Sequence, residues 1–198
     1  MLKSFSYICH PLFMPLACVL FYFYKSPRYI PYDIVKFKTL SLFILTILLP
    51  ILISYVLKMM GKIDSIHLKT TKERILPLLI YAAIIVLVIK RVIPVQEFTE
   101  LYYFFLGVLF STLSCALLLF FKFKTSLHMM AISGLFMFFV SLSIHYHINA
   151  LGSIAIISLL MGAVASSRLA FKAHTSQELL IGMCLGIIPQ FILTPYWL

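Results

Sequence analysis

The sequence predicts an all-α protein that crosses a membrane as a polytopic transmembrane helical bundle, with about six core helices and one more, seven spans in all. The chain has 198 residues, and 63% of them are hydrophobic, with a mean hydropathy of +1.08. Only 11% are charged, whereas soluble domains carry about 25%. The spans and their short loops use the whole chain, so residues 1–198 are interpreted as one integral membrane domain.

Apolar segments of about 20 residues match the thickness of the hydrocarbon core of a bilayer. The expected spans are 4–24, 39–59, 77–91, 101–121, 128–146, 150–171 and 178–197. Residues 4–24 are interpreted as a retained span because His10, Pro11 and Pro15 interrupt them and no cleavage site is apparent. Pro50 is tolerated inside a membrane helix, and Pro77 is expected at the first position of its helix.

These spans divide the connections between two membrane faces. Side X carries the N-terminus and the loops 58–76, 122–128 and 168–178, and the remaining loops lie on side Y. Side X has ten of the 16 Lys and Arg residues, which by the positive-inside rule favours the cytoplasm. The net charge of +10 sits between apolar segments, so the expected partners are anionic membrane lipids and not nucleic acid.

Side X also gathers the residues able to do chemistry, in three clusters. The third cluster reads Ser167-Arg168, five residues, His174, three residues, Glu178. Four residues apart, His174 and Glu178 are expected on one helix face, where the carboxylate would orient the imidazole as a nucleophile. The guanidinium of Arg168 suits phosphate.

The second cluster lies at the start of the fifth span. Ser126 and helix N-terminal amides predict an anion site, and His128 could act as a general acid. Lys122 and Lys124 are interpreted as head-group anchors.

The first cluster, which includes Lys69, Lys72 and Arg74, precedes Pro77. Its cations are candidate phosphate ligands, although basic residues at helix ends commonly serve as anchors. The four cysteines have no metal-ligand spacing and are interpreted as buried small residues, and His10 is expected to pack or to cap.

The order of these clusters resembles the type 2 phosphatidic acid phosphatase superfamily of membrane lipid phosphatases. The third motif of that family matches at Ser167, Arg168 and His174, with Glu178 in place of Asp. Its second motif, Pro-Ser-Gly-His, corresponds to 125–128, where Ser and His are kept. Its first motif, Lys, six residues, Arg-Pro, corresponds loosely to Lys69 and Arg74. The motif-bearing core is about 58–198.

The resemblance implies a membrane phosphatase that acts without a metal or cofactor on a lipid phosphate or isoprenoid (undecaprenyl) diphosphate. It implies His174 as the nucleophile that forms a phosphohistidine, Glu178 as its orienting partner and His128 as the acid. Its phosphate ligands would be Lys69 or Lys72, Arg74, Ser126, Ser167 and Arg168. The expected location is the bacterial cytoplasmic (inner) membrane.

Two departures leave alternatives open. Leu127 replaces a Gly that lets the backbone approach phosphate, and the first motif is altered. A non-catalytic member of the same fold, which binds an anionic lipid or a partner protein, is therefore a second hypothesis. A small transporter component is a third, and it would require polar residues in mid-span.

Overall fold

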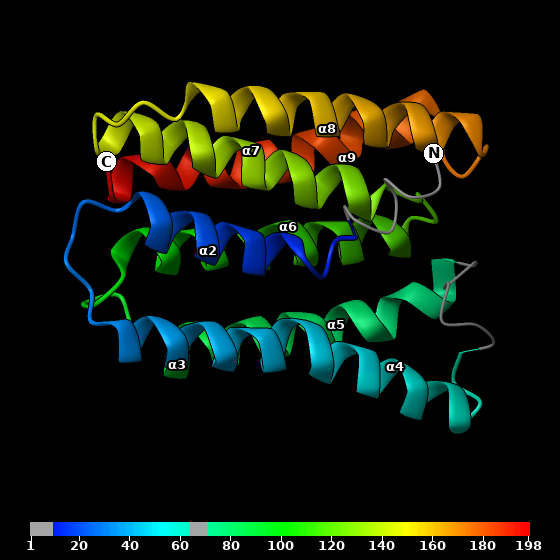
Figure 1. Ribbon diagram of the computed structural model, residues 1–198. Helices are drawn as coiled ribbons and strands as arrows, with labels where there is room; N and C mark the ends of the chain where they lie inside the picture. The colour runs from blue at the N-terminus through cyan, green and yellow to red at the C-terminus, as the bar shows by residue number, and fades with distance from the viewer. Residues whose placement is uncertain (1–9, 64–70) are drawn as a thin grey trace.

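Helices form the regular structure of the residues that the computed structural model describes, which are 10–63 and 71–198 without the side chain of Lys72. Their bounds are α2 (Met14–Lys25), α3 (Tyr32–Phe43), a π-helical segment (Ile44–Leu48), α4 (Leu49–Met59), α5 (Thr71–Leu87), a second π-helical segment (Val88–Val92), α6 (Thr99–Phe120), α7 (Leu127–His145), α8 (Leu151–Ala170), α9 (Ser176–Leu193) and a 3₁₀ turn (Thr194–Tyr196). The helices lie side by side in an elongated bundle (Figure 1). The predicted all-α helical bundle is confirmed.

Six helical stretches in the described part of the chain are long and apolar enough to cross a membrane. They correspond to the last six predicted spans, and the chain is an integral membrane protein by this criterion. The first apolar segment differs, since α2 has 12 residues and is about 18 Å long at 1.5 Å per residue. Residues 4–9 of that predicted span lie outside the described residues.

Three prolines mark where the helices agree with or depart from the predicted spans. The second span begins at Tyr32, directly after Pro31, so the preceding loop is shorter than expected. The π-helical turn ends just before Pro50, which has no N–H to continue the α-helical bonding pattern. Pro77 lies inside α5 and does not start it, so that prediction was wrong. Because α5 already begins at Thr71, Arg74 lies in its first turn and not on a loop.

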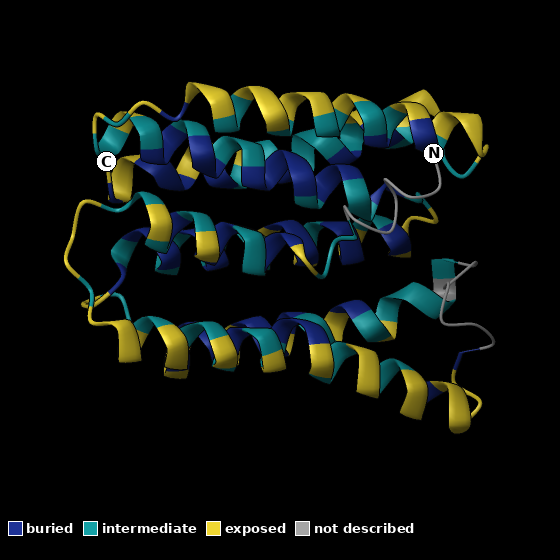
Figure 2. Cartoon of the chain, viewed as in Figure 1, coloured by how far each residue is buried: buried dark blue, intermediate teal, exposed yellow. Residues whose placement is uncertain are grey.

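Helix α7 lies at the centre of the bundle and packs against α9, α8 and α2. Figure 2 shows buried residues on α6 and α7 and long exposed stretches on α3, α4 and α8. Small residues let α7 and α9 approach closely, since a Cβ atom on Gly182 would lie 2.7 Å from the carbonyl oxygen of Ser126. A Cβ atom on Gly186 would collide with Ser133. This close packing holds the N-terminal ends of α7 and α9 together.

The α6–α7 and α8–α9 connections of side X lie at one end of the bundle, and the α2–α3 and α7–α8 connections of side Y lie at the other (Figure 1). His10, the α6–α7 turn and the α8–α9 turn lie at the side-X end. The start of α6 and the end of α7 lie at the side-Y end. The two ends therefore present separate sets of polar residues.

Candidate functional site

The α8–α9 turn holds the predicted pair of His174 and Glu178 in contact. The Nδ1 atom of His174 lies 2.7 Å from the Oε2 atom of Glu178. The same oxygen accepts the backbone N–H of Thr175 at 3.2 Å, and the hydroxyl of Thr175 accepts the N–H of Glu178. This is a capping box, so Thr175 is the N-cap of α9 and His174 precedes the helix. The shared helix face predicted for the pair was wrong, although the contact was expected.

The contact with Glu178 fixes the tautomer of a neutral His174. A carboxylate can only accept, so Nδ1 of His174 donates and its Nε2 keeps a lone pair. The side chain of His174 is only 6% exposed. Glu at the third helical position is the residue that a capping box uses. The capping box therefore accounts for a Glu at position 178.

Two cations approach this pair from other elements. Burial lowers the pKa of His174 below its ordinary value, the hydrogen bond with Glu178 opposes that shift, and the positive charges of Lys124 and Arg74 add to it. Lys124 itself reaches across the turn and donates to the carbonyl of Ala173 at 3.4 Å. Its pKa is lowered by burial and by Arg74, with Glu178 opposing. Lys124, interpreted from the sequence as an anchor, therefore lies beside His174.

A second group joins α8 to α7. The Nη2 atom of Arg168 lies 3.2 Å from the Nε2 atom of His128. Because a guanidinium only donates, Nε2 of His128 accepts here, which places the proton of a neutral ring on Nδ1. The Nε atom of Arg168 is buried and has no hydrogen-bond partner among the described residues. A buried cationic donor without an acceptor is the feature that an anion would satisfy.

At the start of α7, Ser126 and Leu127 both contact other parts of the chain. The hydroxyl of Ser126 caps α7 by accepting the N–H of Met129 at 3.4 Å, and the N–H of Ser126 donates to the carbonyl of Glu178 at 3.3 Å. The hydroxyl and the N–H of Ser126 thus both form hydrogen bonds with backbone groups. The side chain of Leu127 packs against the apolar cluster that includes Leu78 and Leu119.

The backbone connects the two groups. The N–H of Ala173 bonds to the carbonyl of Arg168 at 3.0 Å, so Arg168 and His174 flank one tight turn. Ser167 is fully buried at the end of α8. Lys69 lies outside the described residues, as does the side chain of Lys72. The described residues contain no group of three or more His, Cys, Asp or Glu that could hold a metal ion.

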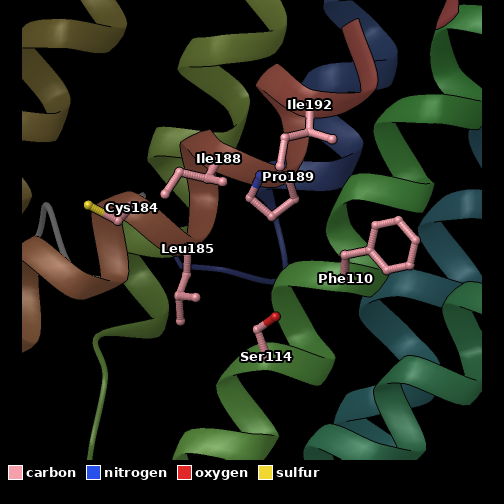
Figure 3. A pocket seen from close by; sticks show the side chains of 7 residues that line it. All are labelled: Phe110, Ser114, Cys184, Leu185, Ile188, Pro189 and Ile192. Atoms are coloured by element: carbon pink, nitrogen blue, oxygen red, sulfur yellow. The ribbon is translucent and has the colours of Figure 1, made fainter.

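An apolar groove of about 280 Å³ lies between α6 and α9. Figure 3 shows Phe110 and Ser114 on α6 facing Leu185, Pro189 and other residues of α9. Leu185 lies seven residues after Glu178, which places both on one face of α9. The groove therefore follows the face of α9 that carries Glu178 at its side-X end.

Sequence reasoning missed a polar cluster at the side-Y end. Glu100 is 1% exposed and accepts the hydroxyl of Tyr146 at 2.6 Å and that of Tyr22 at 3.1 Å. Arg28 and His145 each lie 3.4 Å from its Oε1 atom. The signal in the sequence was Glu100 itself, a lone carboxylate in the first turn of an apolar segment, which needs partners if it is buried. Its partners could not be identified because they are far along the chain.

Comparison of this chain with protein-family models, with curated proteins and with solved structures finds no match.

Proposed function

We propose that this membrane protein is a phosphatase that hydrolyses a lipid phosphate or isoprenoid diphosphate through a phosphohistidine. The observation that carries the proposal is the 2.7 Å contact between His174 and Glu178, with Arg74 and Lys124 close enough to influence the imidazole. A nucleophile, the group that orients it and cations for the phosphoryl oxygens are the parts that phosphoryl transfer needs.

In the first step, the lone pair on Nε2 of His174 attacks phosphorus. An N–P bond forms and the bond from phosphorus to the leaving oxygen breaks. Glu178 holds the proton on Nδ1 and stabilises the positive ring that results. Arg74, Lys124 and Arg168 neutralise the charge of the phosphoryl oxygens, so the route needs no metal ion. Lys69, Lys72 and Ser167 remain proposed additional ligands.

His128 takes up a proton from solvent on Nε2 as substrate binds and gives that proton to the leaving oxygen. In the second step it takes a proton from the water that attacks phosphorus, the N–P bond breaks, and phosphate and free His174 result. Arg168 currently donates to Nε2 of His128. We therefore infer that Arg168 turns from His128 to the phosphoryl oxygens as substrate binds, which frees Nε2 to carry the proton.

The apolar part of the substrate would lie in the groove between α6 and α9. That groove is lined by apolar side chains and follows the face of α9 that bears Glu178. An anionic head at the side-X end and a chain along the groove is the arrangement expected of a membrane lipid. The proposed location is the bacterial inner membrane.

The test is phosphate release by purified protein from undecaprenyl diphosphate, phosphatidic acid and phosphatidylglycerol phosphate. The informative variant is His174→Asn, whose amide can still donate to Glu178 but cannot attack phosphorus. We expect it to lower release by at least about 1000-fold. His147→Asn is the matched control, since His147 is exposed at side Y with a φ of 51° that Asn tolerates. Release that persists in His174→Asn would contradict the proposal.

Two contacts favour a second candidate, a non-catalytic protein that binds an anionic lipid. Nε2 of His128 is engaged by Arg168, and the hydroxyl of Ser126 is engaged as a helix cap. Binding of phosphatidic acid vesicles without release of phosphate from any of the three lipids would select this candidate.

A further inference from the structure

His10 lies in the turn before α2 and packs against the second group of the site. Its ring centroid is 5.5 Å from that of His128, with the ring planes at 82°. The N–H of Leu12 points to its Nδ1 atom at 3.4 Å. Because Nδ1 accepts, a neutral His10 carries its proton on Nε2. The N-terminal segment therefore brings a third nitrogen-rich side chain to Arg168 and His128.

The surroundings of His10 favour its neutral form while no anion is bound. The described titratable and charged groups that face it are Arg168 from α8 and His128 from α7. Burial lowers the pKa of His10, and the positive charge of Arg168 lowers it further. An anion placed beside Arg168 would reverse the second effect, because a negative charge favours the protonated imidazole.

We propose that His10 is a ligand of the phosphoryl anion, forming a three-sided seat with Arg168 and His128. The buried Nε of Arg168, which lacks a hydrogen-bond partner among the described residues, is the donor that shows where the anion belongs. The inference rests on the phosphoryl site of the proposed function and adds a residue that no motif contains. It applies to a tetrahedral oxyanion with at least two negative charges.

Binding of the anion is then linked to uptake of a proton. The proton comes from solvent and stays on His10, which donates to the anion, and no covalent bond forms or breaks. A group whose pKa rises on binding makes the ligand bind more tightly as pH falls. Each unit by which the anion raises the pKa of His10 increases affinity up to about tenfold at low pH.

The experiment measures binding of sulfate to the purified full-length protein in detergent at pH 6, 7 and 8. Sulfate keeps its charge over this range, so the pH dependence reports groups of the protein. Ring-nitrogen chemical shifts of ¹⁵N-histidine give the half-saturating concentration. The variants are His10→Gln, which keeps a neutral donor, and His10→Phe, which keeps the edge-to-face ring packing. His147→Asn is the control.

We expect wild-type protein to bind sulfate at least about tenfold more tightly at pH 6 than at pH 8. His10→Gln should match wild type at pH 8 and lose about tenfold of that gain at pH 6, and His10→Phe should lose the same share and bind more weakly throughout. Any gain that both variants keep comes from His128. Wild-type pH dependence in both variants, or no sulfate binding by wild type, overturns the inference. If the protein releases phosphate from lipids and sulfate binding by His10→Gln keeps the wild-type pH dependence, only the role of His10 is contradicted. If sulfate binds as expected but no lipid is hydrolysed, the anion site is supported and the phosphatase is contradicted.

Discussion

At the side-Y end of the bundle one buried carboxylate, Glu100, meets two phenols, a guanidinium and an imidazole, all within 3.4 Å. At the side-X end the proportions are reversed, since Arg74 and Lys124 lie near Glu178, which already contributes to a helix cap and bonds to His174. A third cation, Arg168, lies against His128 across the α8–α9 turn. The side-Y cluster satisfies the charge of Glu100 within the protein. The side-X end holds a buried donor, Nε of Arg168, that lacks an acceptor among the described residues.

The difference separates stability from function. A polar cluster whose members satisfy one another stabilises the fold and has little to offer a ligand. A cluster with excess positive charge costs stability, and that cost is recovered when an anion binds. We therefore expect substitutions at side Y to change stability, and matched substitutions at side X to change activity.

The largest effect should come from a matched pair of arginine variants. Arg168→Met removes a cation from the proposed phosphoryl site, so phosphate release should fall at least about 100-fold with little loss of stability. Arg28→Met removes the cation near Glu100, so release should stay within about twofold, and the free energy of unfolding should fall by at most about 1 kcal/mol because Arg28 is half exposed. The measurements are phosphate release and thermal unfolding in detergent. Equal loss of release in both variants would remove the distinction between the two ends.

A pair of glutamate variants tests the same distinction through stability. Glu100→Gln takes the charged acceptor from Tyr22 and Tyr146, so the free energy of unfolding should fall by about 3 kcal/mol. Glu178→Gln should cost less than about 1 kcal/mol, because Gln also completes a capping box. Chemical unfolding in detergent measures both. A larger loss of stability in Glu178→Gln than in Glu100→Gln would contradict the assignment of stability to the side-Y end.

The smallest effect concerns pH. His174 must be neutral to attack phosphorus, and its pKa is lowered by burial, so release should decline only as pH falls below about 6.5, the ordinary value for His. Glu178 raises this pKa, so Glu178→Gln should move the acidic limb of the pH–rate profile to lower pH while it reduces the rate. The same sign holds for stability, since a His with a lowered pKa contributes stability above its unfolded pKa that is lost as pH falls. A limb that moves to higher pH in the variant would contradict the assignment.

Local spacing was enough to predict part of the site. His174 and Glu178 are four residues apart, and their contact forms through the capping box of one helix end. The order of spans along the chain also predicted that the α6–α7 and α8–α9 turns share one end of the bundle (Figure 1). Both inferences depend on neighbours in sequence or on the alternation of spans, which the pattern of hydropathy contains.

Other features depended on partners far along the chain. Tyr22 and Glu100 are 78 residues apart, and their contact requires the end of α2 and the start of α6 to lie at the same level of the bundle. The N–H of Ser126 bonds to the carbonyl of Glu178 because Gly182 lets α9 approach α7, and the phosphate-binding role of Ser126 stays a prediction. Such contacts arise from helix packing, which spacing along a single helix does not specify.

The sequence by itself determined that this chain is a membrane-spanning helical bundle whose connections alternate between two ends. It could do so because apolar segments of about 20 residues leave few other solutions in a bilayer. The tertiary structure decided that Arg168 lies against His128, that His10 joins them and that Glu100 is enclosed. Those outcomes depend on how helices rotate and shift against one another, which small residues such as Gly182 and Gly186 control through the distance between backbones.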